Sequence, residues 1–240
     1  MGELHVLRVF TAPSGEHGNP LGVFLDGAEV PEDERQAFAR DLGFSETVFV
    51  DEMVSGPPLR GACIEIERAE MRIFTPEVEL PFAGHPTVGV AWLLREARGE
   101  VAVLRPPAGD LHVRYENDLT WIAARPEWSP PFSYPELGSA TEVDALDGPL
   151  GERWVYTWAW DDEEAGRVRA RAFIAEAGIT EDEATGSAAL TLCAQLERPI
   201  QVRQGEGSEI FARPVNDGYV EVGGRVVLDE VRAYPTVESR

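Results

Sequence analysis

The 240-residue sequence contains no lysine, and all 21 of its basic residues are arginine. Without lysine, the chain cannot form a Schiff base with pyridoxal phosphate. It also cannot supply the phosphate-binding lysine of a Walker-type nucleotide hydrolase. Both classes of enzyme are therefore excluded.

Cysteine is scarce, with Cys63 and Cys193 the two examples. Two cysteines are too few for a disulfide framework, and a reducing environment is the default for such a chain. Cys63 falls in a strand-like pattern and Cys193 on the apolar face of a predicted helix, so we interpret both as core residues. The four histidines are not spaced as metal ligands, and the sequence predicts no metal site.

Long apolar runs are also missing. No segment approaches the roughly 20 apolar residues that a membrane-spanning helix needs, and residues 1–5 lack the basic and apolar regions of a secretory signal. The net charge of −22 repels phosphate backbones and anionic lipids. We therefore expect a cytoplasmic protein that binds neither nucleic acid nor membranes. A small anionic substrate is compatible with this charge, because helix N-termini reverse the field inside a cleft.

An internal repeat indicates how the chain is organised. A strand-like segment at residues 72–76 leads through an acidic loop to Gly84-His85 and an apolar helix. A second such segment at residues 171–175 leads in the same way to Gly186-Ser187 and another apolar helix. The repeat predicts an α+β fold of two similar lobes, each a barrel-like sheet wrapped around a central helix.

We predict that residues 1–108 form the N-terminal lobe, with a C-terminal strand recruited from residues 226–240. Residues 109–225 then form the C-terminal lobe. Residues 31–42 are predicted to form an amphipathic helix, because acidic residues crowd its first turn and Gly43 follows it.

The two glycines of the repeat suggest an anion site. Gly84 and Gly186 each precede an apolar helix, where a glycine lets a ligand approach the backbone and the free N–H groups favour negative charge. Each glycine alone is better explained by an ordinary helix cap, but the repeated pair favours binding. His85 precedes Pro86, which suits the first turn of a helix, so the helix dipole should keep the imidazole neutral.

Three further polar residues are candidates for the site. Glu46 lies between apolar neighbours, and burial would raise the pKa of its carboxyl and suit it to acid–base catalysis. An exposed position at the start of a strand explains Glu46 equally well. Asp182 either turns into the site or complements a helix N-terminus with its acidic neighbours. Asn19 is interpreted first as a turn residue, with an amide directed at the site as the alternative.

Four segments of the chain, taken in order, form a specific pattern. They are residues 9–24 with Gly18-Asn19-Pro20, residues 45–50, residues 72–89 and residues 181–188. In these segments the chain resembles the phenazine biosynthesis PhzF-like family, whose fold is that of diaminopimelate epimerase. The resemblance implies two barrel-like lobes with a site in the cleft between them.

The resemblance also implies an activity. It identifies Glu46 as the general acid–base of an isomerase that moves a proton on a small carboxylate-bearing metabolite, without metal or organic cofactor. His85 and Asp182 are the other catalytic candidates, and Ser187 joins Asn19, Gly84 and Gly186 as a candidate substrate-binding residue. A homodimer is expected for this architecture.

The chain departs from the family pattern in three places. Glu183 stands where proline or alanine is expected, residues 110–160 are short for a second lobe, and the usual G-R-P-S stretch is replaced near Glu206-Gly207-Ser208. The shortened lobe leaves open a non-catalytic metabolite-binding protein, and an epimerase of an amino-acid-like substrate is a further alternative. The cysteine-based amino-acid epimerases of the same fold carry their paired thiols at the starts of the two helices. Here Ala83 and Thr185 occupy those positions, so racemisation by two thiols is disfavoured.

Overall fold

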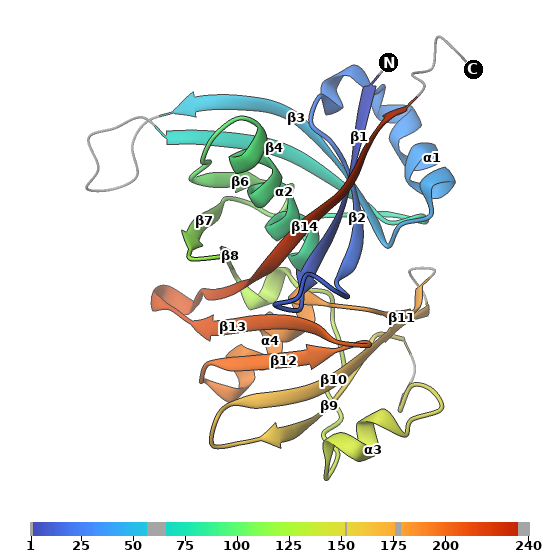
Figure 1. Ribbon diagram of the computed structural model, residues 1–240, viewed down its shortest axis with the longest axis vertical. Coiled ribbons are helices and arrows are strands. Elements are labelled where there is room, and N and C mark those ends of the chain that lie inside the picture. The colour runs from blue at the N-terminus through green and yellow to red at the C-terminus, as the bar shows by residue number, and fades with distance from the viewer. Residues whose placement is uncertain (1, 57–65, 152, 176–178, 235–240) are drawn as a thin grey trace.

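The computed structural model describes residues 2–56, 66–151, 153–175 and 179–234. The chain forms two lobes stacked along the long axis of the molecule (Figure 1). One central helix belongs to each lobe: α2 (Gly84–Ala97) to the first and α4 (Gly186–Leu196) to the second. Both helices are apolar on most sides because both are enclosed by sheet. Within these ranges no helix combines the length and apolarity needed to cross a membrane.

The first lobe is a closed ring of strands around α2. The strands follow one another around the ring in the order β1, β2, β3, β4, β6, β7, β8 and β14, and β14 pairs with β1 to close it. Their bounds are β1 (Gly2–Thr11), β2 (Asn19–Phe24), β3 (Glu46–Gly56), β4 (Ile66–Phe74), β6 (Val103–Arg105), β7 (Leu111–Glu116), β8 (Leu119–Ala124) and β14 (Val220–Tyr234). The short strand β5 (Glu79–Leu80) pairs with β4 outside the ring.

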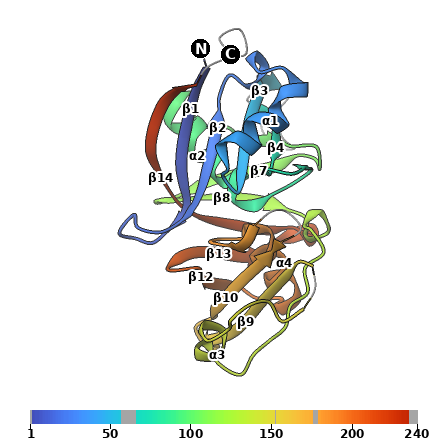
Figure 2. The same ribbon diagram turned by 90° about the vertical axis from the view of Figure 1, so that its right-hand side faces the viewer.

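The second lobe continues the same sheet. From β14 the order runs through β13, β12 and β10, and both β9 and β11 pair with β10. Their bounds are β9 (Val155–Asp162), β10 (Arg167–Ile174), β11 (Ile179–Asp182), β12 (Ile200–Gln204) and β13 (Ser208–Pro214). Helix α4 packs against β13 and β14, and the short helix α3 (Ala140–Asp144) packs against β9 and β10. Figure 2 shows the strands of this lobe stacked below the ring.

Helix α1 (Glu32–Leu42) covers the outside of the ring. Three acidic residues occupy its first turn, and Gly43 ends it with a positive φ of 68°. Its buried Phe38 packs with Phe24 and Phe49 of the ring in a core separate from the one around α2. The helix predicted at residues 31–42 therefore begins one residue later than expected.

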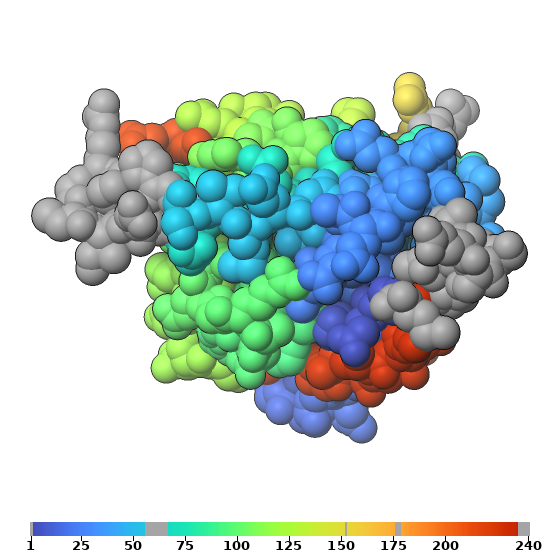
Figure 3. Space-filling view, turned by 90° about the horizontal axis from the view of Figure 1, so that it is seen from above, coloured from blue at the N-terminus to red at the C-terminus, as the bar shows by residue number. Residues whose placement is uncertain are grey.

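Strand β14 ties the two lobes together. Its first residues pair with β8 and β13, and residues 225–234 pair with β1. Figure 3, seen from above the first lobe, shows the N-terminal strand lying against the last strand on the molecular surface.

The predicted division between residues 108 and 109 falls between β6 and β7. Because β7 pairs with β6, and β8 with β14, both strands continue the ring of the first lobe. We therefore propose that the division follows Ala124 and that the end of β14 returns to the first lobe. Residues 235–240, which completed the recruited strand in the prediction, lie outside the described ranges.

Candidate active site

The N-termini of α2 and α4 meet at the boundary between the lobes. A Cβ atom on Gly84 would lie 2.6 Å from the carbonyl carbon of Gly186 and 2.7 Å from the nitrogen of Ser187. A side chain at Gly84 would prevent this approach. The two glycines of the repeat predicted from the sequence are therefore in direct contact. Neither helix start carries a side-chain cap. The N–H groups of both first turns therefore favour an anion between them.

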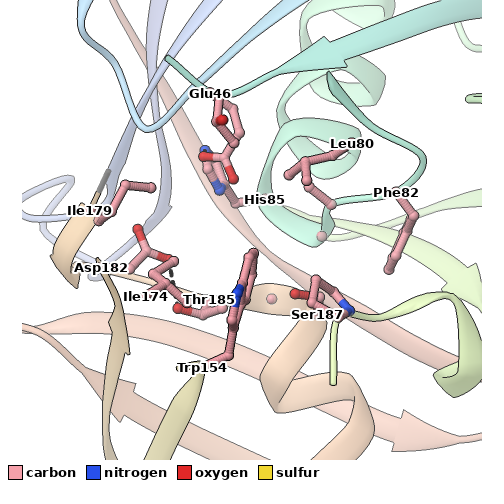
Figure 4. A pocket seen from close by; sticks show the side chains of 15 residues that line it. Glu46, Leu80, Phe82, His85, Trp154, Ile174, Ile179, Asp182, Thr185 and Ser187 are labelled. Atoms are coloured by element: carbon pink, nitrogen blue, oxygen red, sulfur yellow. Dashed lines mark hydrogen bonds and ion pairs between the residues drawn. The ribbon is translucent and has the colours of Figure 1, made fainter. Parts of the chain in front are cut away.

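A small, partly open cavity lies at this junction. Both lobes contribute to its wall, so the site exists only while the lobes are packed together. Figure 4 shows Glu46 and His85 on one side of the cavity and Asp182, Thr185 and Ser187 on the other, with the Trp154 indole between Thr185 and Ser187 in this view. The lining residues are Glu46, Thr75, Leu80, Phe82, Ala83, Gly84, His85, Pro130, Trp154, Ile174, Ile179, Asp182, Thr185, Gly186 and Ser187.

Glu46 is the first residue of β3, where the strand pairs in parallel with β2 and Leu21 lies opposite. Glu46 is 7% exposed, and its Oε2 has no hydrogen-bond partner within the described protein. Burial, and then the negative charge of Asp182, raise the pKa of Glu46 to about 8, and a hydrogen bond from Ser45 offsets part of this rise. A carboxyl with this pKa exchanges protons readily near neutral pH. The structure therefore favours the buried alternative for Glu46 over the exposed one.

His85 is the second residue of α2 and faces Glu46. Its Nε2 lies 3.4 Å from Glu46 Oε2 and has no hydrogen-bond partner within the described protein. Burial lowers the pKa of His85 to about 3, although a hydrogen bond to the Pro20 carbonyl opposes the shift. The ring is therefore neutral, as the sequence predicted, but the main cause is burial, whereas the prediction invoked the helix dipole.

Asp182 ends β11 and is 4% exposed. Its Oδ1 accepts a 2.7 Å hydrogen bond from Asn19 Nδ2, and its Oδ2 accepts a 2.6 Å bond from Thr185 Oγ1. Burial raises the pKa of Asp182 to about 6; the bonds from Thr185 and Asn19 oppose this rise, and the charge of Glu183 adds to it. The carboxyls of Glu46 and Asp182, one from each lobe and both with raised pKa values, thus line the same cavity.

Asn19 links the lobes behind the cavity. Its Nδ2 donates to Asp182 Oδ1 and, at 3.0 Å, to the Ala184 carbonyl, and its Oδ1 accepts from Ser45 Oγ at 3.0 Å. These bonds use both hydrogens of the amide, and Asn19 is not among the cavity-lining residues. Asn19 thus lies beside the predicted site, where its hydrogen bonds hold Asp182 in position.

Several residues that shape the site were not assigned to it from the sequence. Gln204, which with Gly205 also resembles the family, donates to the Asp182 carbonyl at 2.8 Å and to Thr185 Oγ1 at 2.9 Å, which fixes the start of α4 from β12. Leu80 and Phe82 lie within the motif of residues 72–89, Pro130 lies in a proline-rich loop, and Trp154 begins an aromatic, strand-like segment. The fold, and no spacing in the sequence, shows that these four side chains line the cavity.

The cysteines do not contribute a nucleophile to the described site. Cys193 is buried in α4, and burial raises the pKa of its thiol to about 12. The thiol therefore stays protonated at neutral pH. Cys63 lies outside the described residues. Among those that are described, no three His, Cys, Asp or Glu side chains form a group suited to a metal ion.

The sequence profile of the family described as phenazine biosynthesis-like protein (PhzC-PhzF) matches residues 7–153, which is more than half of the chain. The chain belongs to this family. A trans-2,3-dihydro-3-hydroxyanthranilate isomerase of Pseudomonas aeruginosa is 31% identical to this chain, and the alignment covers 81% of this chain and 80% of that protein. The PhzC-PhzF relatives thus include a named isomerase that aligns along most of the chain.

Other PhzC-PhzF relatives align over shorter stretches. An isomerase of Pasteurella multocida, named as uncharacterized, is 37% identical over 47% of this chain. A second, from Mesorhizobium japonicum, is 47% identical over 35% of it. In these two alignments the chain spans 36% and 24% of the relatives' lengths.

Solved structures confirm the predicted two-lobed α+β fold. A putative PhzC/PhzF protein of Clostridium difficile superposes with a TM-score of 0.76 at 20% identity, covering 98% of this chain and 100% of that one. A protein of Pseudomonas aeruginosa described as a predicted epimerase superposes with a TM-score of 0.70 at 26% identity, with coverage of 98% and 100%. A probable proline racemase of Agrobacterium radiobacter shares the fold at a TM-score of 0.61, covering 98% of this chain and 93% of that one.

Proposed function

We propose that this PhzC-PhzF protein is an isomerase that moves a proton on a small carboxylate-bearing substrate, with Glu46 as the general acid–base. One observation carries the proposal: the buried Glu46 carboxyl, with its Oε2 unpaired within the described protein, lines the cavity between two helix N-termini. The isomerase relatives support the class of reaction. No cofactor is required by this chemistry.

The geometry suggests a role for each group. In its ionised form Glu46 takes a proton from a carbon of the substrate, and the protonated carboxyl returns it to another carbon. The charge that develops in between is stabilised by N–H groups at the starts of α2 and α4. In this proposal the neutral His85 ring and Asp182 hold a polar substituent, and Ser187 and Gly186 bind the substrate carboxylate.

The apolar part of the cavity points to an unsaturated or cyclic substrate. Leu80 and Phe82 line it from the first lobe, and Trp154 lines it from the second. These side chains exclude water around the reacting carbons, which strengthens electrostatic interactions with the polar groups opposite.

The test is incorporation of solvent deuterium into substrate, followed by mass spectrometry. The first compound to assay is trans-2,3-dihydro-3-hydroxyanthranilate, followed by other small unsaturated carboxylates. Glu46→Gln should reduce exchange by about 10²-fold to 10⁴-fold, while Glu52→Gln, an exposed substitution on the same strand, should leave it unchanged. Full exchange by a folded Glu46→Gln protein would exclude Glu46 as the base.

A second candidate function is epimerisation at a single carbon by Glu46 and Asp182. It is favoured by the raised pKa values of two carboxyls on one cavity and by the structural likeness to a predicted epimerase. Inversion of the substrate's configuration, followed by chiral chromatography, separates this function from movement of the proton between carbons. Tight metabolite binding that Glu46→Gln leaves unchanged, without any exchange, would instead indicate a non-catalytic protein.

The remaining expectations concern the whole protein. A homodimer and a cytoplasmic location stay predictions. Light scattering coupled to size-exclusion chromatography tests the first, and a fluorescent fusion in the source cell tests the second.

A further inference from the structure

The loop between β1 and β2 carries the first lobe onto the second (Figures 1 and 2). The N–H of Gly18 donates a 2.9 Å hydrogen bond to Ser208 Oγ, at the start of β13. His17 packs on Gly207, where a Cβ atom would lie 2.6 Å from an imidazole carbon. Arg8 Nη1 donates to the carbonyls of Gly15 and His17, which holds the loop in shape.

Glu183 completes this contact from the second lobe. Its Oε1 accepts a 2.8 Å hydrogen bond from Ser208 Oγ and a 3.1 Å bond from the N–H of Glu206. Gly205 has a φ of 56°, and a Cβ atom there would fall 2.0 Å from Glu183 Oε2. The carboxylate therefore lies flat on the backbone of the β12–β13 turn. It does not line the cavity.

The hydroxyl of Ser208 has one hydrogen, and Glu183 accepts it. This bond orients the Ser208 oxygen as the acceptor for Gly18. The next residue of the loop is Asn19, whose amide binds Asp182 and Ala184, the two neighbours of Glu183. Gly18 and Asn19 of the first lobe thus hold residues 182–184 of the second: Asn19 binds Asp182 and Ala184 directly, and Gly18 is linked to Glu183 through Ser208.

We propose that Glu183 is a positioning residue: it holds Ser208 as the acceptor for Gly18 and thereby keeps Asn19 on Asp182 at the candidate active site. This inference rests on the proposed function of that site. It also gives a role to the residue at which the sequence departs from the family pattern.

Glu183 has a second effect that can be separated from the first. Its charge raises the pKa of Asp182, after the larger effect of burial, while Asn19 and Thr185 oppose the rise through hydrogen bonds. Other ionisable groups near Asp182 are Glu46, whose pKa its charge raises, and Tyr156 from β9. Glutamine at position 183 removes the charge but retains a carbonyl acceptor for Ser208, whereas alanine removes both.

The experiment measures two properties of the free protein by NMR: the exchange rate of the Gly18 amide hydrogen and the titration midpoint of the Asp182 carboxyl. The variants are Glu183→Gln, Glu183→Ala and Ser208→Ala. Glu206→Gln is the control, since it removes one exposed negative charge from the same turn.

Glu183→Ala and Ser208→Ala should accelerate exchange at Gly18 about fivefold to tenfold, because each removes a link of the hydrogen-bond chain. Glu183→Gln should keep the exchange rate within about twofold of wild type. The Asp182 midpoint should fall in Glu183→Gln, which loses the charge, and stay unchanged in Glu206→Gln. It should rise in Ser208→Ala, because Asn19 is then no longer held in the hydrogen bond that lowers the pKa of Asp182. In Glu183→Ala both effects act, so its midpoint should lie above that of Glu183→Gln. A purely structural role for Glu183 would not produce this separation between the two measurements.

Unchanged Gly18 exchange in Glu183→Ala and Ser208→Ala would overturn the proposal. Equal exchange rates in Glu183→Gln and Glu183→Ala, or an unchanged Asp182 midpoint in Glu183→Gln, would also overturn it. Neither measurement uses a substrate, so failure here is distinct from failure of the proposed function. If the isomerase assay succeeds, the KM should rise in Glu183→Ala more than in Glu183→Gln.

Discussion

At the scale of single residues, the buried Glu46 carboxyl makes stability depend on pH. Its ordinary pKa of 4.5 describes the unfolded chain, whereas the folded pKa is about 8. Between these two values the unfolded chain has lost a proton that the folded protein keeps. This group's contribution to stability is therefore fully present below pH 4.5 and is lost as the pH rises through 8.

Glu46→Gln should therefore be more stable than wild type at high pH. The advantage should be larger at pH 9 than at pH 5 by about 2 kcal/mol or more, since one pKa unit corresponds to roughly 1.4 kcal/mol. Urea unfolding at the two pH values measures it. Because the Asp182 charge raises the pKa of Glu46, the substitution also changes the titration of Asp182, and the difference reports Glu46 together with this coupling. An advantage that is equal at both pH values would show that Glu46 is ionised in the folded protein.

Phe10 shows a second residue-scale effect, backbone strain next to the site. It is fully buried and has a φ of 68°, which a bulky side chain adopts only at a cost. Its ring lies 3.0 Å from the position of a Cβ atom on Gly186 and 2.4 Å from that on Gly224. The ring thus fixes the start of α4 against β14.

Phe10→Ala should lower the free energy of unfolding by about 3–5 kcal/mol and should also raise the KM of the reaction found by deuterium exchange. Phe38→Ala is the matched control, because Phe38 is equally buried but belongs to the separate core under α1. That variant should lose comparable stability without a change in KM. Denaturant unfolding and steady-state kinetics measure the two effects, and a KM unaffected by Phe10→Ala would remove the ring from the binding geometry.

At the scale of elements, the proposed anion site depends on the close approach of α2 and α4. Gly84→Ala places a methyl group 2.6–2.8 Å from the backbone of Gly186 and Ser187, so the helix starts must separate. We expect a loss of about 1–3 kcal/mol in stability and an increase in KM of about tenfold or more. Gly148→Ala is the control, since nothing lies within 4 Å of the added atom. A wild-type KM in Gly84→Ala would show that these N–H groups do not bind substrate.

The elements that the sequence predicted well are those with local signals. The helix over residues 31–42 has an acidic first turn and a terminal glycine, and both apolar helices follow glycines of the repeat. The pairing of the strands was not predictable in the same way. The predicted division at residues 108 and 109 differs from the proposed one after Ala124, because no local pattern shows that β7 and β8 continue the ring.

The same distinction applies to the candidate site. Glu46, His85 and Asp182 were identified from motifs, and all three line the cavity. Asn19 was interpreted first as a turn residue and kept as a candidate for substrate binding. The atoms that its amide bonds belong to the opposite lobe, which the local sequence does not reveal. Trp154 was missed because its role depends on packing between lobes, which no sequence spacing records.

At the scale of the whole molecule, charge dominates the surface. The 43 acidic residues exceed the 21 arginines, for a net charge of −22, and much of this excess must repel itself in the folded state. Added salt screens such repulsion over a Debye length of about 10 Å at 0.1 M. Raising NaCl from about 20 mM to 500 mM should therefore raise the Tm by about 2–4 °C.

Differential scanning calorimetry at fixed pH tests this prediction, with sucrose at equal osmolarity as the control for effects unrelated to charge. A Tm that falls with salt would show that ion pairs such as Arg8–Asp229 and Arg171–Glu181 outweigh the repulsion.

The path of β14 through both lobes has a consequence for how the protein folds. Closing the ring requires Gly2 to pair with Tyr234, and Val9 with Val226, across almost the full described chain. Contacts between such distant residues form slowly, because loop-closure entropy opposes them until the rest of the structure is in place. Until β14 arrives, β1 presents one unpaired edge to other molecules. Refolding should therefore be slow, and its yield should fall as protein concentration rises, because open rings can then pair with each other through that edge.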